Sequence, residues 1–171
     1  MWNAFPYSKL RIQYASKCNS NIEILRICRE EGFELDASSV GEIILALLAD
    51  FTPEQITFTN LYKSDNDIAF AAQIGIAAIT ADSMEELERM NRVGQHIGKK
   101  IKTFVRINPE IEVEFYSTKK QKYGIPVKQA KKAIDFVIKA KHLDLLGLHF
   151  HGAYIKNYRA YFLTTEKLLK L

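Results

Sequence analysis

The sequence predicts an α/β protein whose strands form part of a (β/α) barrel. Short apolar or β-branched runs alternate with amphipathic helical patterns, in the order βαβαβαβαβαβα. The first five strands begin about 20 to 26 residues apart, the length of a compact βα unit, which predicts parallel strands joined by right-handed crossovers. Polar side chains then follow nearly every strand, and a barrel gathers all such strand ends around one mouth.

Six runs have strand character, at residues 10–15, 33–35, 56–59, 77–80, 103–107 and 145–150. Helical patterns occupy residues 21–31, 39–50, 64–73 and 158–171, with further helix starts at Ser83 and Pro126. Ser39 with Glu42, and Ser83 with Glu86, have the spacing of a capping box, in which each side chain bonds a free amide of the first turn. Residues 108–125 are predicted to form a long loop between a strand and a helix.

The alternative architecture is an open, doubly wound sheet. Such a sheet gathers only the strand ends beside its switch point, whereas the polar residues here follow all six predicted strands. They are Lys17, Asp36, Asn60, Asp82, Arg106, Asn108, His149 and His151. No GxGxxG or GxxxxGK[ST] motif follows the first strand, so the pattern favours the barrel over a nucleotide-binding sheet.

The predicted barrel is partial. A complete barrel has eight βα units and roughly 250 residues, whereas six units are recognisable in these 171 residues. The parallel sheet would keep open edges, which are sites of aggregation. We therefore expect a fragment, or a chain that another chain completes.

Composition bounds the class of protein. The chain is 47% hydrophobic and 26% charged, and neither a run of about 18 apolar residues nor a signal-peptide layout is present, so we expect one domain in the cytoplasm with no membrane partner. Cys18 and Cys28 lack a CxxC spacing, which argues against a disulfide framework or zinc site. The net charge is +4, but the lysines of residues 128–141 lie opposite an apolar helix face, and no recognition motif accompanies them. We expect no nucleic-acid partner.

Lys17 is the candidate reactive amine. It follows a β-type segment and precedes a helix-start signal in the run YASKCNSN, residues 14–21. A lysine at the end of a buried strand is partly desolvated, which favours the neutral, nucleophilic amine. Position alone, however, favours the ordinary alternative of a solvated strand-end lysine.

His149 and His151 form a second candidate group. Alternation along a strand places them on one face, which Arg106 at the end of the preceding strand can approach. A metal site is the weaker interpretation, because no carboxylate or third histidine stands at a suitable spacing. A purely structural pair of histidines stays open.

Five segments together resemble one family, the fold-type III pyridoxal-phosphate decarboxylases. The family motifs are YAxKANxN, GFDVxSxGE, RxNP, STGxxxxKFG and GxHxHIGS. Their counterparts here are YASKCNSN (14–21), GFELDASSVGE (32–42), FVRINP (104–109), STKKQKYG (117–124) and GLHFH (147–151), in the family's order. The resemblance implies a barrel of the alanine racemase-like type with pyridoxal 5′-phosphate as cofactor.

The resemblance also implies roles for four residues. Lys17 becomes the catalytic lysine that binds the cofactor covalently, which reverses the preference for a solvated lysine. Arg106 lies near the cofactor, His151 stacks on its pyridine face, and Asp36 stands close to the lysine.

Among the family's members, the diaminopimelate decarboxylases are the group that the RINP and ST…KYGI segments resemble most. The reaction implied is conversion of meso-diaminopimelate to L-lysine and CO2, in lysine biosynthesis, by an enzyme that binds a small amino acid and is a homodimer at full length. The alternatives are an ornithine- or arginine-type decarboxylase of polyamine pathways, or a non-catalytic barrel remnant that binds the cofactor without turnover.

The chain also departs from the family pattern. Residues 152–154 are Gly-Ala-Tyr where the family has Ile-Gly-Ser against the cofactor phosphate, and Cys18 replaces the usual alanine. The glycine-rich phosphate loop, the glutamate at the pyridine nitrogen and the C-terminal β-domain have no counterpart. We expect residues 1–171 to be a partial cofactor-binding barrel domain that is inactive alone.

Overall fold

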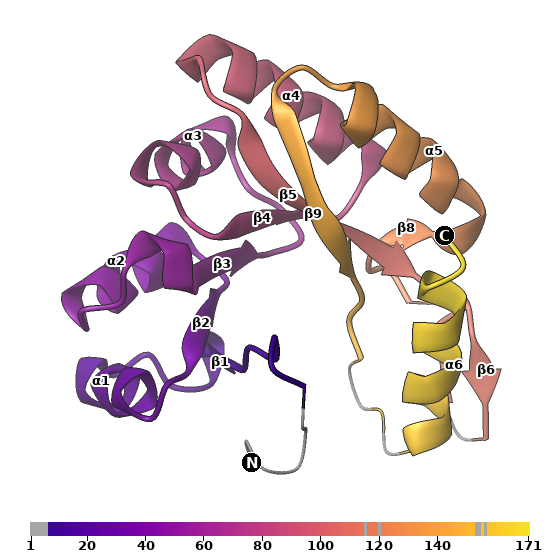
Figure 1. Cartoon of the computed structure of the whole chain (residues 1–171), viewed down its shortest axis with the longest axis horizontal. Coiled ribbons are helices and arrows are strands. Elements are labelled where there is room, and N and C mark those ends of the chain that lie inside the picture. The colour runs from indigo at the N-terminus through magenta and orange to yellow at the C-terminus, as the bar shows by residue number, and fades with distance from the viewer. Residues whose placement is uncertain (1–6, 115, 120, 153–154, 156) are drawn as a thin grey trace.

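Parallel strands and the helices that follow them build the structure, a computed structural model that describes residues 7–114, 116–119, 121–152, 155 and 157–171 (Figure 1). The main strands are β1 (Gln13–Ala15), β2 (Glu34–Ala37), β3 (Ile56–Thr59), β4 (Ala78–Ala81), β5 (Ile101–Asn108) and β9 (Leu143–His149). They are parallel and lie side by side in chain order, so each new strand joins the same growing edge of the sheet.

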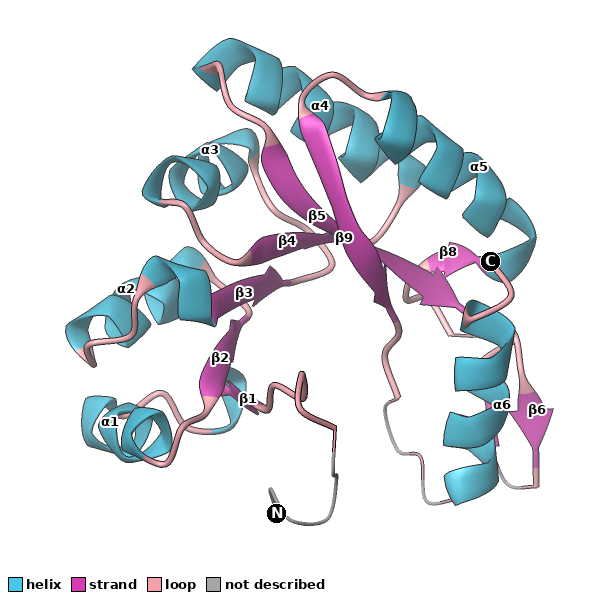
Figure 2. Ribbon diagram, in the orientation of Figure 1, coloured by secondary structure: helices cyan, strands magenta, loops and turns pink. Residues whose placement is uncertain are grey.

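The first five helices cover the outer side of this sheet, and the sixth packs against the segment that follows β5 (Figure 2). They are α1 (Ile22–Glu30), α2 (Val40–Leu48), α3 (Asp65–Ile74), α4 (Met84–Ile97), α5 (Val127–Lys139) and α6 (Tyr158–Leu168), with 3-10 turns η2 (Ser16–Cys18) and η3 (Pro53–Gln55). An open, doubly wound sheet reverses its strand order and carries helices on both faces. The unreversed order, with α1 to α5 on one side, confirms the barrel type.

The core lies between the sheet and its helices. One fully buried side chain from each of the first four helices anchors it, namely Leu25, Ile43, Ile68 and Leu87. Burying a side chain of this size stabilises the fold by about 1.5–3 kcal/mol. Because each of α1 to α5 buries a face in the same layer, the strands are held with their carboxyl ends at one end of the sheet.

Serine residues cap the second, third and fourth helices. Of the two hydrogen bonds in the capping boxes predicted at Ser39 and Ser83, the one accepted by the serine is confirmed and the one accepted by the glutamate is wrong. Each serine does accept a hydrogen bond from the amide three residues on. The carboxylates of Glu42 and Glu86 instead accept from the amide one residue before the serine, and each also bonds a side chain of the preceding βα unit. These glutamates therefore join neighbouring units rather than closing their own first turn. Of these three serine-capped helices, the third has the full capping box, between Ser64 and Asp67.

The long segment after β5 is fastened back onto that strand. It holds a hairpin of β6 (Glu112–Val113) and β7 (Tyr116–Ser117), and β8 (Ile125–Pro126), which pairs with the end of β5. Asn108 Nδ2 donates to the Thr118 carbonyl oxygen at 2.9 Å, and Thr118 is fully buried. Gly124 has a φ of +80°, and a Cβ there would lie 3.0 Å from the Arg106 Cγ. The prediction of a long loop thus missed the β6–β7 hairpin and the short strand β8, which pairs with the end of β5.

Each edge strand of the described sheet pairs with one neighbour: β1 pairs with β2, and β9 pairs with β5. Among the described residues, no helix combines the length and apolar character needed to cross a membrane.

Candidate functional site

The carboxyl ends of the strands surround a cavity of about 280 Å³. Its lining residues come from the ends of β1, β2, β3, β5 and β9 and from the segment before β8. They are Lys17, Asp36, Ser38, Thr59, Asn60, Leu61, Arg106, Tyr123, His149 and His151. Small-molecule sites have volumes of roughly 300–1,000 Å³, so this cavity has room for a compact ligand. The structure brings all four residues singled out from the sequence, Lys17, Asp36, Arg106 and His151, around it.

Lys17 lies in the 3-10 turn η2, two residues beyond the end of β1. Its side chain is exposed, so the prediction that this lysine is partly desolvated is wrong. The reason is that β1 lies at an edge of the described sheet. The turn itself is held from below, because the Ser16 hydroxyl, fully buried, donates to the Asp36 carbonyl oxygen at 3.2 Å and also to the Glu42 carboxylate.

Asp36 faces Lys17 from the next strand. Burial raises the pKa of this carboxyl group, while the Thr59 hydroxyl and the charges of Lys17 and Arg106 act in the opposite direction. Its Oδ1 atom is buried and has no hydrogen-bond partner among the described residues. Because a buried carboxylate oxygen without a donor is costly, this atom marks a place where the cavity calls for a polar ligand.

Arg106 is fixed between two other strands. Its Nη1 atom donates to the Asp82 carboxylate at 2.6 Å, and its Nε atom donates to the His149 Nδ1 at 3.2 Å. The sheet register creates this arrangement, because Arg106 is paired with His149, and Asp82 follows the last residue of β4. The side chain of Arg106 is 5% exposed and that of Asp82 is 11% exposed. A buried, charge-assisted bond of this kind is among the stronger hydrogen bonds in proteins.

His149 is held as a neutral ring. Burial, followed by the charges of Arg106 and His151, lowers the pKa of His149 to about 3. Since its Nδ1 atom accepts the Arg106 hydrogen, the ring proton is assigned to Nε2. The imidazole is therefore a hydrogen-bond donor at the atom that Arg106 leaves free.

His151 lies two residues beyond His149, on the same side of the chain, and lines the same cavity. Its ring contacts Tyr123 edge to face, with 5.1 Å between the ring centroids. Burial and the positive charges of Arg106 and Lys17 lower the pKa of His151, and Asp82 opposes them. The neutral, aromatic ring is thus favoured near pH 7.

The sequence patterns assigned no role to Asp82 or Tyr123, whereas His149 was a candidate, and the expected approach of Arg106 to it is confirmed by their hydrogen bond. The contact of Asp82 with Arg106 depends on the sheet register. Tyr123 lies in the segment of residues 117–124, and its sequence position gives no sign that it would reach His151. Gly152 follows His151, and a Cβ added at this glycine would lie 3.0 Å from Ile155. The departure from the family pattern at residues 153 and 154 lies outside the described residues.

The metal interpretation of the histidine pair finds no support in the described part of the chain, where no group of three His, Cys, Asp or Glu side chains could hold an ion. Both cysteines are free thiols.

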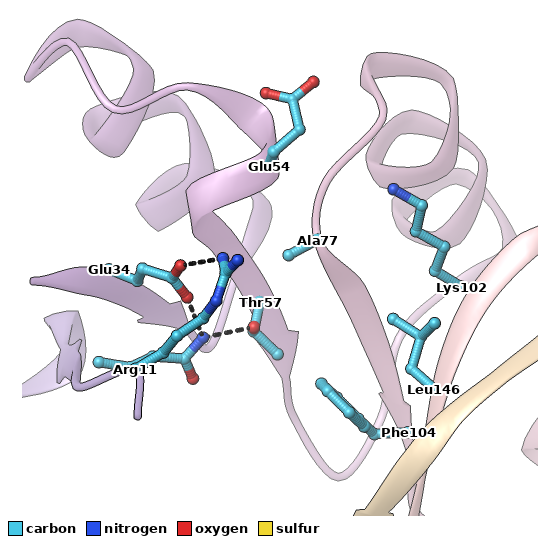
Figure 3. Close-up of a pocket in the computed structure, with 9 residues that line it drawn as sticks. Arg11, Glu34, Glu54, Thr57, Ala77, Lys102, Phe104 and Leu146 are labelled. Carbon is cyan, nitrogen blue, oxygen red and sulfur yellow. Dashed lines mark hydrogen bonds and ion pairs between the residues drawn. The ribbon is translucent and has the colours of Figure 1, made fainter. Parts of the chain in front are cut away.

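A larger cavity, of about 580 Å³, lies at the opposite end of the strands (Figure 3). Four of its polar side chains already bond in pairs: Arg11 pairs with Glu34 at 2.5 Å, and Gln13 Nε2 donates to the Thr57 hydroxyl at 2.7 Å. In barrels the amino-terminal face serves stability and the carboxyl face serves chemistry. The smaller cavity, with its unpaired Asp36 oxygen and its perturbed histidines, is therefore the candidate site.

Comparisons with known proteins identify what this arrangement resembles. A family model described as "Pyridoxal-dependent decarboxylase, pyridoxal binding domain" matches residues 1–171. Diaminopimelate decarboxylase from Staphylococcus aureus is 35% identical over 170 residues, which cover 95% of this chain and 40% of that protein. The enzyme of the same name from Bacillus subtilis is 31% identical and is covered to 39%. The chain thus spans about two fifths of the length of these relatives.

Solved structures agree. The crystal structure of diaminopimelate decarboxylase from Helicobacter pylori complexed with L-lysine aligns with a TM-score of 0.91 and 30% identity, over 99% of this chain and 44% of that one. The arginine decarboxylase of Paramecium bursaria Chlorella virus aligns with a TM-score of 0.81 at 21% identity, over 96% of this chain and 43% of that one. At that identity the second likeness concerns the fold alone.

The depressed pKa of His149 predicts a specific acid sensitivity. An unfolded histidine has a pKa near 6.5, so between about pH 6.5 and pH 3 the unfolded state binds a proton that the folded state refuses. Stability is therefore fully present above pH 6.5 and is lost as the pH falls, by up to about 1.4 kcal/mol per pH unit. His149→Asn keeps an acceptor for Arg106 but cannot titrate, so urea denaturation at pH 7 and pH 5 should show a loss smaller by about 2 kcal/mol. His96→Asn, at an exposed histidine outside the cavity, is the matched control and should leave the loss unchanged, whereas equal losses in the unaltered protein and His149→Asn would contradict the assignment.

Proposed function

Because the chain belongs to the pyridoxal-dependent decarboxylases, we propose that it forms the cofactor-binding wall of an enzyme that decarboxylates meso-diaminopimelate to L-lysine. The observation that carries the proposal is the convergence of Lys17, Asp36, Arg106 and His151 on one cavity. The named relatives support this substrate, since proteins called diaminopimelate decarboxylase are 28–35% identical over 85–98% of this chain.

The residues around the cavity fit pyridoxal 5′-phosphate. Lys17 offers an exposed primary amine that can bond an aldehyde carbon covalently. His151 offers an aromatic ring at the cavity wall, and the buried Asp36 Oδ1 lacks a hydrogen-bond donor that a polar group could supply. When bound, the cofactor supplies an electron sink for the electron pair left behind as the carboxylate departs as CO2.

The protein's own groups bind, orient and move protons. Lys17 would hold the cofactor through Nζ, and its free amine can carry a proton at that atom. Arg106 keeps a fixed positive charge beside the reacting groups, because Asp82 and His149 prevent it from turning away. A charge that is already in position needs no reorganisation when negative charge develops.

The two histidines contribute without charge. His151 can cover one face of a flat ligand with its aromatic ring, and its lowered pKa favours the uncharged form of that ring. His149 can donate a hydrogen bond from Nε2, because Arg106 already occupies its Nδ1. Asp36 stands near Lys17, where its carboxyl group can share a proton with the amine.

Two further features belong to the proposal through the family resemblance. The full-length enzyme is proposed to be a homodimer. The protein is proposed to act in the cytoplasm, which its two free thiols suit.

The cofactor assignment predicts a covalent adduct at one lysine. Incubation with pyridoxal phosphate, reduction with borohydride and peptide mass analysis should place the adduct on Lys17, because its amine is exposed at the cavity. Lys17→Ala should abolish this adduct. Lys102→Ala, which removes an exposed lysine at the opposite end of the sheet, should leave it intact. An unaltered protein without label at Lys17 would refute the cofactor assignment.

A second experiment separates the possible substrates. CO2 release should be measured with diaminopimelate, ornithine and arginine on the proposed full-length enzyme with pyridoxal phosphate added, because residues 1–171 are expected to be inactive alone. Release from diaminopimelate, lost in Lys17→Ala, is the expected result. Release only from ornithine or arginine would transfer the protein to the polyamine-type decarboxylases. Silence on all three, together with an adduct at Lys17, would favour cofactor binding without turnover.

A further inference from the structure

Lys63 is a charged residue in the interior, outside the cavity lining. Its side chain has no exposed surface, and Nζ donates to the Asn60 carbonyl oxygen at 2.8 Å and to the Glu86 Oε2 at 3.1 Å. The ammonium group also lies 5.7 Å from the centre of the Phe58 ring. Glu86 is itself only 3% exposed, and Arg89 approaches its other oxygen at 3.5 Å. Lys63 and Glu86 thus form a buried ion pair.

Stability alone is a poor reason for such a pair. Removing two charges from water costs several kcal/mol per ion, and apolar replacements of similar volume are often as stable or more so. Burial indeed lowers the pKa of Lys63, although Glu86 acts to raise it. The pair therefore calls for an explanation in what it contacts.

One carboxylate oxygen connects the pair to the candidate site. Glu86 Oε2, which accepts from Lys63, also accepts from the Asp82 amide at 2.8 Å. The Asp82 carboxylate then holds Arg106, which holds the Nδ1 of His149. Four buried or nearly buried charges, Lys63 (+), Glu86 (−), Asp82 (−) and Arg106 (+), lead from the interior to the cavity wall, and the Asp82 amide joins the two carboxylates.

Glu42 provides an internal comparison. It occupies the same position in α2 as Glu86 does in α4, and it accepts from the Ser38 amide at 2.9 Å just as Glu86 accepts from the Asp82 amide. Its partner in the preceding unit, however, is the neutral Ser16 hydroxyl. A neutral partner thus suffices to fasten a helix start to its neighbour. The cation appears at the helix whose first turn adjoins the carboxylate that binds Arg106.

We propose that Lys63 and Glu86 are a positioning pair that keeps Asp82, and through it Arg106, directed at the cavity. With Lys63 in place, Glu86 is neutralised and does not compete with Asp82 for Arg106. The catalytic meaning of this role rests on the proposed function, whereas the positioning of Arg106 does not.

The test follows Arg106 through its contact with His149. In Lys63→Met, Glu86 loses its buried partner, Asp82 loses its fixed position, and Arg106 leaves the Nδ1 of His149. Long-range ¹H–¹⁵N NMR of the histidines should show His149 change from the Nε2-protonated form to a mixture of tautomers, with its pKa raised by about one unit. His149→Asn assigns the signal. The neighbours His151, Lys17 and Asp82 are unaltered throughout.

Two more variants secure the result. Glu86→Ala removes the acceptor for the Asp82 amide and leaves Lys63 free to shed its proton, so it should change His149 in the same way even if Lys63→Met does not fold. The double variant Lys63→Met with Glu86→Gln removes both charges but keeps an amide oxygen for Asp82, and it should return His149 towards its original state.

Leu87→Ala is the matched control, since Leu87 is fully buried beside Glu86 and touches none of these bonds. It should lower Tm and leave the tautomer of His149 unchanged. If Lys63→Met and Glu86→Ala also lower Tm with His149 unchanged, the pair is merely structural and the proposal is overturned. Failure of the Lys17 labelling would refute the proposed function alone, because the His149 signal is read without cofactor.

Discussion

The guanidinium group of Arg106 lies between a carboxylate and an imidazole, and the rest of the candidate site is arranged around it. Asp82 at 2.6 Å and His149 at 3.2 Å fix two of its nitrogen atoms. Three neighbouring strands must hold their register for these contacts to exist. Gly124 packs against the same side chain. Its positive φ and the 3.0 Å distance from an added Cβ to the Arg106 Cγ would strain any other residue at this position. The charge in the cavity is thus a product of the sheet as a whole.

The helices transmit this order through carboxylates near their first turns. The Glu42 carboxylate accepts hydrogen bonds from the Ser38 amide and from Ser16, in the turn that contains Lys17. The Glu86 carboxylate accepts hydrogen bonds from Lys63 and from the Asp82 amide. Each side chain links one βα unit to the unit before it. The outer layer of helices therefore does more than cover the sheet: it sets the direction of the polar side chains at the strand ends.

Sequence patterns predicted the six main strands and the barrel type, because a period of alternation and a strand-end position are local properties. The resemblance to the family singled out the four residues that meet at the cavity. The bond between Asp82 and Arg106 joins residues 24 positions apart, so it depends on a register that no local pattern encodes. Lys63, in the run LYKSD, has the sequence signature of a surface lysine, and only packing buries it. The prediction for Lys17 was wrong in the opposite sense: partial burial was expected, but the side chain is exposed because it follows an edge strand.

The central claim is that Asp82 and His149 act on the same guanidinium group. A double-mutant cycle with Asp82→Ala and His149→Ala, each of which removes an acceptor for Arg106, measures this directly by urea denaturation at pH 7. Residues that share a network show coupling free energies of roughly 0.5–3 kcal/mol, and we expect a value in this range although the two side chains lie on different strands. Additive losses of stability would contradict the claim, because each residue would then act without the other through Arg106.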